Sequence, residues 1–226
     1  MEILVHSFPI YYDDSHPIED VVTVAVVLID AFSGRVITAP VKVSIDGLQA
    51  LPRRNLTGMR VFVNLPPRPE YRIKVEARMA GYFNPPDTPF PPIPPTGDEP
   101  RLDIYLYRRP EFPFDPDTTL VRGRLIRTSG DPVVGGTVTA DLPTVPGGTP
   151  PFEARTDERG VFALPLRMPE NLLPTDLVTF TFENGGPPRA FDKAVREGVQ
   201  NTFRAAIRID GLNEPDLDAF VGDPMP

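Results

Sequence analysis

The chain has 226 residues, of which 31 are proline and 17 glycine, and it contains no cysteine. Without cysteine it can form neither a disulfide nor a thiolate metal site. The net charge of −8 argues against a nucleic-acid-binding surface, which needs a basic stripe. Proline and glycine lie between short apolar runs, which is typical of an all-β protein with long loops because helix interiors tolerate neither residue.

The first stretch, residues 1–19, is expected to be an N-terminal arm or an edge strand. It begins "MEILVHSFPIYYDD", with no basic start and no long apolar run. We therefore expect no signal peptide and no membrane span. The expected location is the cytoplasm or a particle that is assembled there.

Strand patterns then predict a first β-sandwich over 20–108. Residues 20–30, "DVVTVAVVLID", are rich in β-branched residues and apolar at consecutive positions, so both faces of this strand should be covered. Clean alternation or apolar runs predict the other strands, at 41–46, 59–65, 71–78 and 101–108.

A proline-rich segment, 83–100, interrupts this sandwich with eight prolines. Proline cannot donate to a strand ladder, so we expect a stiff, extended connection and not a central strand. Two interpretations stay open. The segment is a crossing loop of the first sandwich, or it is a ligand for an aromatic-lined groove on a partner, with Phe90 and Ile93 as candidate contact residues.

The segment 109–117 is predicted to be a linker, because prolines stand at 110, 113 and 116. Its Asp115 and Asp117 are weighed as a calcium site against a solvated linker. A second β-sandwich is predicted over 118–210, with a short helix at 190–197 between its last strands. The acidic tail, 211–226, is either a frayed terminus or a docking arm anchored by Leu217, Phe220 and Val221.

The two predicted sandwiches repeat one pattern. The stretch "TDERGVFALPLR", 156–167, has an earlier echo in "LTGMRVFVNLPPR", 56–68. Gly34 corresponds to Gly130, 41–45 to 138–142, and 58–62 to 160–162 with a two-residue offset. In each half, a glycine turn runs into an apolar strand that closes the core of a sandwich.

The stretch 121–166, "VRGRLIRTSGDPVVGGTVTA…RTDERGVFALPL", resembles the carboxypeptidase regulatory-like domain, a transthyretin-like β-sandwich. The matching parts are Gly123, the run Gly130-Asp131-Pro132-Val133, and Thr156-Asp157 with Gly160 and Phe162. The first half, 21–107, is a weaker match. The resemblance implies a fold of two tandem Ig-like or transthyretin-like antiparallel sandwiches, but it implies no particular function.

Two chemically equipped relatives of this fold do not fit the residues. Collagen-adhesin B-type domains use a lysine and a buried glutamate for an isopeptide bond, and those positions fall here on the apolar 26–29 run and on Val75. Intradiol dioxygenases hold iron with two tyrosines and two histidines. This chain has only His6 and His16, both outside the sandwich pattern.

No nucleophile–base pair, phosphate loop or zinc spacing appears, so we expect no enzyme and no cofactor. The predicted function is a structural or adaptor role in a larger assembly, such as a phage-tail-like or contractile injection particle. It would act through protein partners or self-association, without nucleic acid. The alternative is a module that binds glycans or peptides. Tyr105 and Tyr107 are its candidate contacts on one strand face, unless they are simply half-buried on an edge strand.

Overall fold

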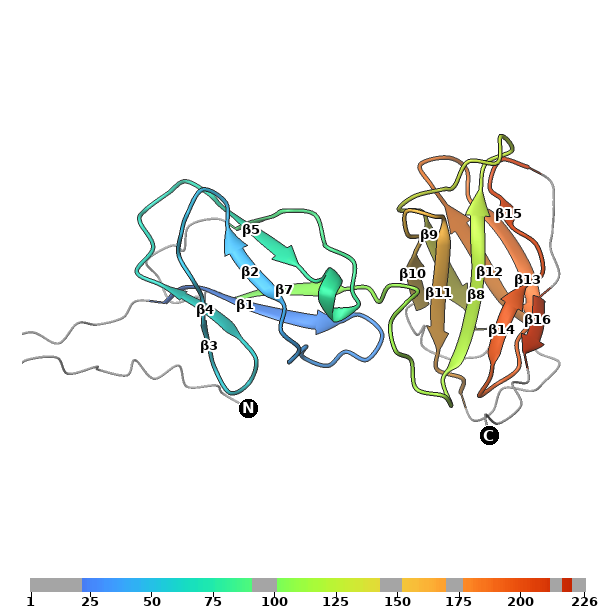
Figure 1. The fold of residues 1–226 in the computed structure, drawn as a ribbon, viewed down its shortest axis with the longest axis horizontal. Coiled ribbons are helices and arrows are strands. Elements are labelled where there is room, and N and C mark those ends of the chain that lie inside the picture. Colours follow the sequence, from blue (N-terminus) through green and yellow to red (C-terminus); the bar gives the residue numbers. More distant parts are fainter. Residues whose placement is uncertain (1–21, 91–100, 143–151, 170–176, 212–216, 221–226) are drawn as a thin grey trace, which may run out of the picture. The chain divides into compact units, whose positions relative to one another are not determined.

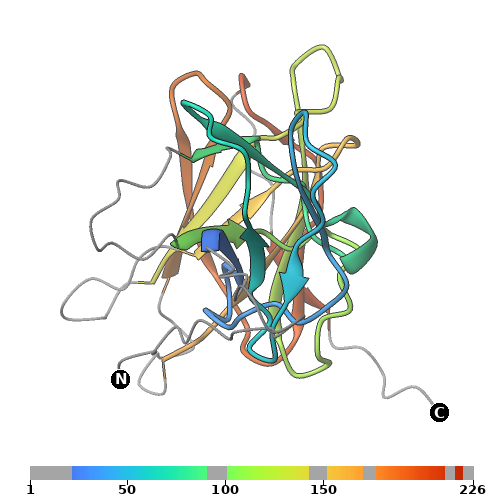
Figure 2. The same ribbon diagram turned by 90° about the vertical axis from the view of Figure 1, so that its left-hand side faces the viewer.

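The computed structural model describes residues 22–90, 101–142, 152–169, 177–211 and 217–220. The chain divides into two compact units. The first consists of Met1–Ala80 and Asn84–Leu106, and the second of Gly81–Phe83 and Tyr107–Pro226. The described residues are strands and loops apart from one turn of 3₁₀-helix, η1, at Arg78–Ala80. Long loops join short strands in both units (Figure 2), so the expected all-β class is confirmed.

The first unit contains two sheets (Figure 1). One has the order β3-β4-β1-β7 and the other the order β2-β5-β6. Their strands are β1 (Val22–Asp30), β2 (Lys42–Ile45), β3 (Arg53–Arg54), β4 (Arg60–Val63), β5 (Tyr71–Glu76), β6 (Thr88–Phe90) and β7 (Arg101–Leu106).

Strand β1 is buried on both faces, as its sequence predicts. Val24, Val26 and Leu28 face the core, and the alternate residues Val27 and Ile29 are buried as well. β1 pairs antiparallel with β4 but parallel with β7, its neighbour on the other side. The sandwich is therefore not wholly antiparallel.

The buried Arg60 of β4 ties the loop before β2 to this sheet. Its guanidinium donates to the carbonyl oxygens of Gly58 at 2.8 Å, Ala39 at 3.2 Å and Val41 at 3.4 Å. Burial lowers the pKa of Arg60, with a smaller contribution from the nearby charge of Arg54. Three backbone carbonyls satisfy a cation inside the fold, so this side chain has a structural role.

Part of the proline-rich segment belongs to the first sandwich. Residues 88–90 form the edge strand β6, whose Phe90 pairs with Tyr71 of β5. An edge position suits proline because the ladder needs no donor on its outer side. Residues 91–100 lie outside the described part.

The second unit also contains two sheets, ordered β10-β9-β12-β13 and β11-β8-β14-β16, with β15 pairing beside β8. Their strands are β8 (Thr119–Ile126), β9 (Thr137–Asp141), β10 (Phe152–Arg155), β11 (Val161–Leu166), β12 (Leu177–Glu183), β13 (Arg189–Ala194), β14 (Gln200–Phe203), β15 (Ile207–Arg208) and β16 (Leu217–Phe220).

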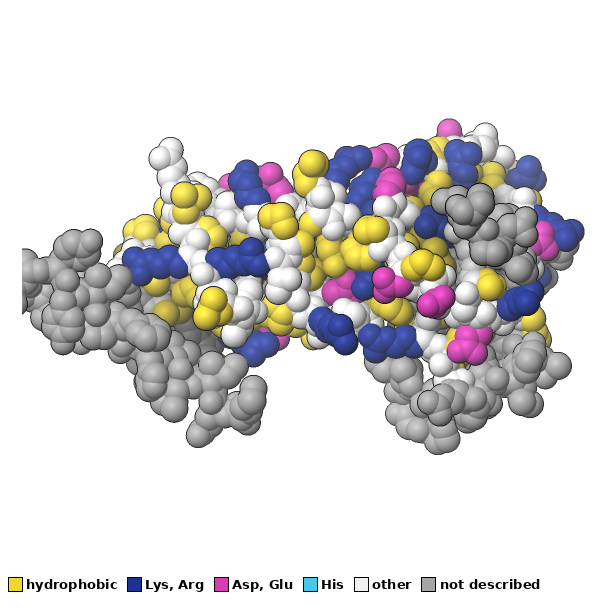
Figure 3. All heavy atoms as spheres, turned by 60° about the horizontal axis from the view of Figure 1, so that its bottom comes forward, with side chains coloured by type: hydrophobic (Ala, Val, Ile, Leu, Met, Phe, Trp, Pro, Cys, Tyr) yellow, Lys and Arg dark blue, Asp and Glu magenta, His cyan; other side chains and the backbone are white. Residues whose placement is uncertain are grey.

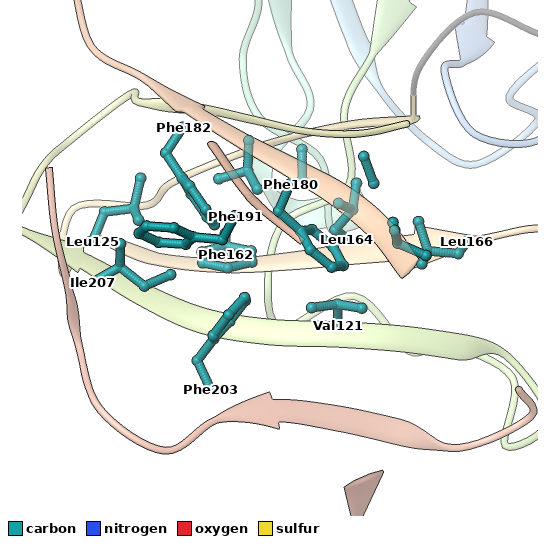
Figure 4. Packing of buried hydrophobic residues seen from close by; sticks show 14 of the residues in the cluster. Val121, Leu125, Phe162, Leu164, Leu166, Phe180, Phe182, Phe191, Phe203 and Ile207 are labelled. Atoms are coloured by element: carbon teal, nitrogen blue, oxygen red, sulfur yellow. The ribbon is translucent and has the colours of Figure 1, made fainter. Parts of the chain in front are cut away.

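The core of the second unit is built around phenylalanine rings from both sheets (Figure 4). Phe162 lies 6.1 Å from Phe182 and 6.3 Å from Phe203, measured between ring centroids. Phe180 meets Phe203 edge-on at 5.8 Å. Gly123 leaves room for this packing, since a Cβ there would lie 2.7 Å from the Phe162 ring.

The first strands of the two units pair in the same way. In each, the first strand pairs antiparallel with a strand that follows a glycine turn and parallel with a late strand. Gly58 and Gly160 precede these strands with φ angles of 85° and 75°. Gly34 and Gly130 occupy the turn after the first strand, also at positive φ.

Two predictions about the second unit need correction. The predicted helix at 190–197 is wrong, because residues 190–194 lie in β13, which pairs with β12 and buries Phe191, and residues 195–197 follow the strand as loop and turn. The tail was predicted to be frayed or to be a docking arm. Instead, residues 217–220 form β16, which pairs with β14 of the same unit.

Candidate interaction surfaces

The candidate residues of the first unit lie in different environments. Tyr105 stands on β7 with 56% of its surface exposed, which leaves it available for contact. Phe90 is only 8% exposed and belongs to the core, so its assignment as a contact residue is corrected. Ile93 lies outside the described residues.

Tyr107 does not share a strand face with Tyr105. Strand β7 ends at Leu106, and Tyr107 belongs to the second unit. There the guanidinium of Arg155 lies 4.5 Å from the centroid of its ring. Burial, followed by the charge of Glu153, raises the pKa of Tyr107. Its ring is thus engaged within its own unit.

The C-terminal candidates complete the second sandwich. Leu217 is partly buried against the core, so we correct its assignment as an anchor for a partner. Phe220 pairs in register with Gln200. Val221 lies outside the described residues.

The outer side of the β3-β4-β1-β7 sheet is apolar, which is unusual for a sandwich. Side chains directly opposite each other on paired strands project to the same side, so the pairing register defines this side. Its apolar members, which we call the outer apolar face, are Ala25, Val27, Ile29, Val36, Val61, Val63 and Tyr105. An antiparallel sheet that faces water normally carries polar residues there.

The outer apolar face is shielded at its centre and open at its margins. The β1 members are buried, whereas Val36 is 40% exposed and Tyr105 is exposed on the other side of Ile29. Basic residues border one end: Arg53 pairs with Val61, and Arg101 pairs with Ala25. Arg101 also donates to Asp103 at 2.7 Å along the same edge strand.

The β10-β9-β12-β13 sheet of the second unit offers a direct contrast. Its outer side carries Thr137 and Thr139 on β9 and Thr179 and Thr181 on β12. Thr139 pairs with Thr181, Thr137 with Glu183 and Thr179 with Asp141. Thr179 donates to Asp192 at 2.7 Å. This face is therefore polar. Figure 3 shows another side of the molecule, where hydrophobic, basic and acidic side chains are interspersed. A large apolar outer face is thus not a general property of both sandwiches.

The second unit also contains a structured strap, residues 107–118, which sequence reasoning assigned largely to a linker. Two backbone hydrogen bonds join the strap to 81–83: Phe83 donates to Tyr107 and Arg109 donates to Gly81. The ring of Phe112 lies 5.3 Å from that of Tyr82, and the guanidinium of Arg108 covers it at 4.3 Å.

The strap lies against the outer side of β8. Arg122 of β8 donates to the carbonyl oxygen of Pro110 at 2.9 Å, and its guanidinium lies 5.8 Å from the centroid of Phe114. Phe112 and Phe114 alternate with prolines in the sequence, but nothing in that pattern indicates which arginines will cover them. Arginine–aromatic packing is therefore a signal that only the structure supplies.

The "TDERG" turn connects to this strap. The Asp157 carboxylate, only 1% exposed, accepts hydrogen bonds from the backbone amides of Arg159 at 2.9 Å and Val161 at 2.8 Å. The buried Arg109 of the strap donates to Glu158 at 3.1 Å. The repeated motif thus closes a turn and anchors the strap, and it arranges no reactive group.

The part of the chain that the structure describes contains no cluster of metal-binding residues. No group of three or more histidine, aspartate or glutamate residues there could hold a metal ion, so Asp115 and Asp117 form no such group. No lysine is among the buried residues of that part. His6 and His16 lie outside it. Among its helices, none is long and apolar enough to cross a membrane.

No protein-family model matches the chain, and no curated protein matches it by sequence. Among solved structures, it is similar to the TIE protein of Bacillus anthracis at 15% identity and a TM-score of 0.32, over 88% of this chain and 34% of that one. It is also similar to a streptococcal ancillary pilin at 14% identity and a TM-score of 0.28, over 85% of this chain and 63% of that one. The chain thus spans about a third of the first and under two thirds of the second. Likeness at these TM-scores carries no argument about function.

Proposed function

We propose that this protein is a non-catalytic structural or adaptor component that assembles through protein–protein contacts. The outer apolar face carries the proposal. Apolar area that leaves water contributes about 25 cal/mol per Å², and a cluster of apolar side chains on an outer sheet face is a feature of contact surfaces. A particle assembled in the cytoplasm, of the phage-tail or contractile-injection kind, is the setting we propose.

The rival function, a glycan-binding module, finds less support in the side chains. A sugar platform needs exposed aromatic rings together with converging polar groups. Tyr105 and Tyr107 were the expected platform, but they belong to different units and Arg155 covers the Tyr107 ring. We therefore do not propose glycan binding.

The test compares two double variants of the full chain. The face variant, Val36→Glu with Tyr105→Glu, places charge on the outer apolar face. The control variant, Val134→Glu with Leu177→Glu, changes the same kind of residue at similar exposure, 58% and 48%, in the second unit. All four positions are exposed, so both variants should fold, and circular dichroism with thermal melting checks that they do.

Each protein is then immobilised and used to retain partners, including itself, from its native source, followed by mass spectrometry. We expect one or more proteins to be retained by the wild type and the control variant but lost by the face variant. If nothing is retained in a face-dependent way, the proposed function is wrong. Binding on a glycan array in place of a protein partner would favour the rival.

A further inference from the structure

We propose that the outer edge of β7, the edge that faces away from β1, binds residues 4–8 of the same chain as an antiparallel strand. Residues 1–21 lie outside the described part, so the structural argument comes from β7 and from its counterpart in the second unit. The inference goes beyond the proposed function, because it concerns the edge of a sheet and not its outer apolar face.

The two units differ at the strand beside their late strand. β7 and β14 correspond, since each pairs parallel with the first strand of its unit. In the second unit, β14 also pairs antiparallel with β16, whose Leu217 lies opposite Phe203 and packs against the core (Figure 1). In the first unit, β7 is the last strand of its sheet among the described residues. The repeat therefore indicates a strand position next to β7.

The backbone of β7 is arranged to accept such a strand. The carbonyl oxygen of Leu106 accepts a hydrogen bond from the amide of Ala31, just after β1, at 3.1 Å. Alternate residues of a strand direct their N–H and C=O groups to opposite edges. Arg101, Asp103 and Tyr105 therefore direct theirs away from β1. This edge contains no proline and no bulge, and natural sheets seldom leave such an edge uncovered.

Two stretches of the first unit lie outside the described part, 1–21 and 91–100. Residues 91–100 contain five prolines, which have no N–H to give to a ladder. Residues 4–8, "LVHSF", contain none and are mostly apolar. They are therefore the better candidate for the strand position.

The connection to β1 is long enough and has the right direction. Because β1 and β7 are parallel, a strand antiparallel to β7 ends at the end of the sheet where β1 begins. The gap from there to Val22 is about 10 Å across two strand spacings and about 10 Å along the strand. The thirteen residues 9–21 can span up to ~45 Å. A short tether also gives an effective concentration in the millimolar range, which favours the chain's own segment over a second copy.

One register makes the side chains complementary. Placing Leu4 opposite Tyr105 creates three pairs on the outer side of the sheet. These pairs are Leu4 with Tyr105, His6 with Asp103, and Phe8 with Arg101. They join an aliphatic to an aromatic side chain, an imidazole to a carboxylate, and a ring to a guanidinium. Val5 then lies opposite the buried Ile104, and Pro9, which has no N–H, follows where the ladder ends.

The charge of the connection agrees with this path. Residues 9–21 contain four acidic residues and no lysine or arginine. They would pass the end of the sheet where β1 begins, and there Arg53 and Arg101 lie on the outer side. Opposite charges at that end favour the pairing and disfavour other registers.

The test uses two neighbouring proline substitutions in the full chain. In the proposed register, His6 exchanges hydrogen bonds with Asp103, whereas Ser7 directs its N–H away from β7. His6→Pro should therefore break the ladder, and the matched control Ser7→Pro should keep it. Amide hydrogen exchange is measured at Asp103 and Tyr105. We expect protection in the wild type, exchange at least about tenfold faster in His6→Pro, and little change in Ser7→Pro.

Unprotected amides at Asp103 and Tyr105 in the wild type, or equal acceleration by the two prolines, would overturn the inference. Protection that rises with protein concentration would also overturn it, because the strand would then come from a second copy.

A disulfide tests the register independently, since the chain has no cysteine of its own. Leu4→Cys with Tyr105→Cys should oxidise to a cross-linked single chain, because directly opposite residues lie within disulfide range. Val5→Cys with Tyr105→Cys should not, because these side chains would project to opposite sides of the sheet. Non-reducing electrophoresis separates the products. A disulfide-linked dimer, or equal cross-linking of both pairs, would contradict the proposed pairing.

Discussion

Replacing Gly160 with alanine tests the role of the repeated glycine turn. Gly160 has a φ of 75°, and an alanine in that conformation costs about 1 kcal/mol more than glycine. Its Cβ would also lie 2.3 Å from the carbonyl oxygen of Leu125 and 3.2 Å from the amide nitrogen of Val133. These are backbone atoms, so no side-chain rotation can relieve the clash.

Relief requires the strand backbone to shift where it is held by two hydrogen bonds. Leu125 donates to Gly160 at 2.8 Å, and Val133 donates to Leu125 at 3.0 Å. Each of these bonds contributes about 1 kcal/mol. Together with the conformational cost, Gly160→Ala should lower the unfolding free energy of the second unit by about 3 kcal/mol.

Gly130→Ala is the matched control. Gly130 also has a positive φ, 94°, but a Cβ there would meet no atom within 4 Å. Gly130→Ala should therefore lower the unfolding free energy only by the conformational cost of about 1 kcal/mol. Denaturant unfolding, followed by circular dichroism, measures both variants against the wild type. Losses that agree within about 0.5 kcal/mol would refute the argument, because the steric contact would then contribute nothing.

Three further predictions address polar groups. Arg60→Met should destabilise the first unit by about 2 kcal/mol in urea unfolding, because three carbonyl oxygens lose their donor; an unchanged midpoint would contradict this. Asp157→Ala should destabilise the second unit by about 2–3 kcal/mol and Asp157→Asn by less, because an amide oxygen still accepts from the two backbone donors; equal losses would argue against that account. The hydrogen bond from Lys74, followed by the charge of Lys74, lowers the pKa of Asp46. The stability that this exposed pair contributes is therefore fully present above the pKa that Asp46 has in the unfolded chain. It is lost as the pH falls through the lower pKa that Asp46 has in the folded protein. The stability difference between wild type and Asp46→Asn should therefore vanish once the pH is below the folded-state pKa of Asp46, and it should shrink in 1 M salt; a difference that grows in acid would contradict this sign.

Strand periodicity made most of the fold predictable from the sequence. The alternation in 71–76 and the unbroken apolar run of β1 depend only on which faces are buried, and burial is a local property of a strand. The glycine turns could be predicted because positive φ restricts the residue type. Pairing partners could not, since the parallel contact of β1 with β7 joins segments more than 70 residues apart.

The errors arose where two structures share one pattern. Phe191 and Val195 are four residues apart, a spacing that suits one face of a helix and also alternate positions of a strand. The strap has the composition of a linker, and its contacts with Arg108 and Arg122 depend on residues brought together by folding. The outer apolar face was predictable only in part. The sequence indicates that β1 is apolar on both sides, but its neighbours on the sheet come from three separate segments.

The parallel pairing of the first strand with a late strand has a consequence for biosynthesis. β1 gains its partner β7 only when residue 106 has been made, and β8 gains β14 only when residue 203 has been made. Neither sandwich can close while its final strands are still in the ribosome, and such distant pairings fold slowly. Nascent chains of this protein therefore present unpaired apolar strands for most of their synthesis, and they should depend on chaperones more than a helical chain of equal length.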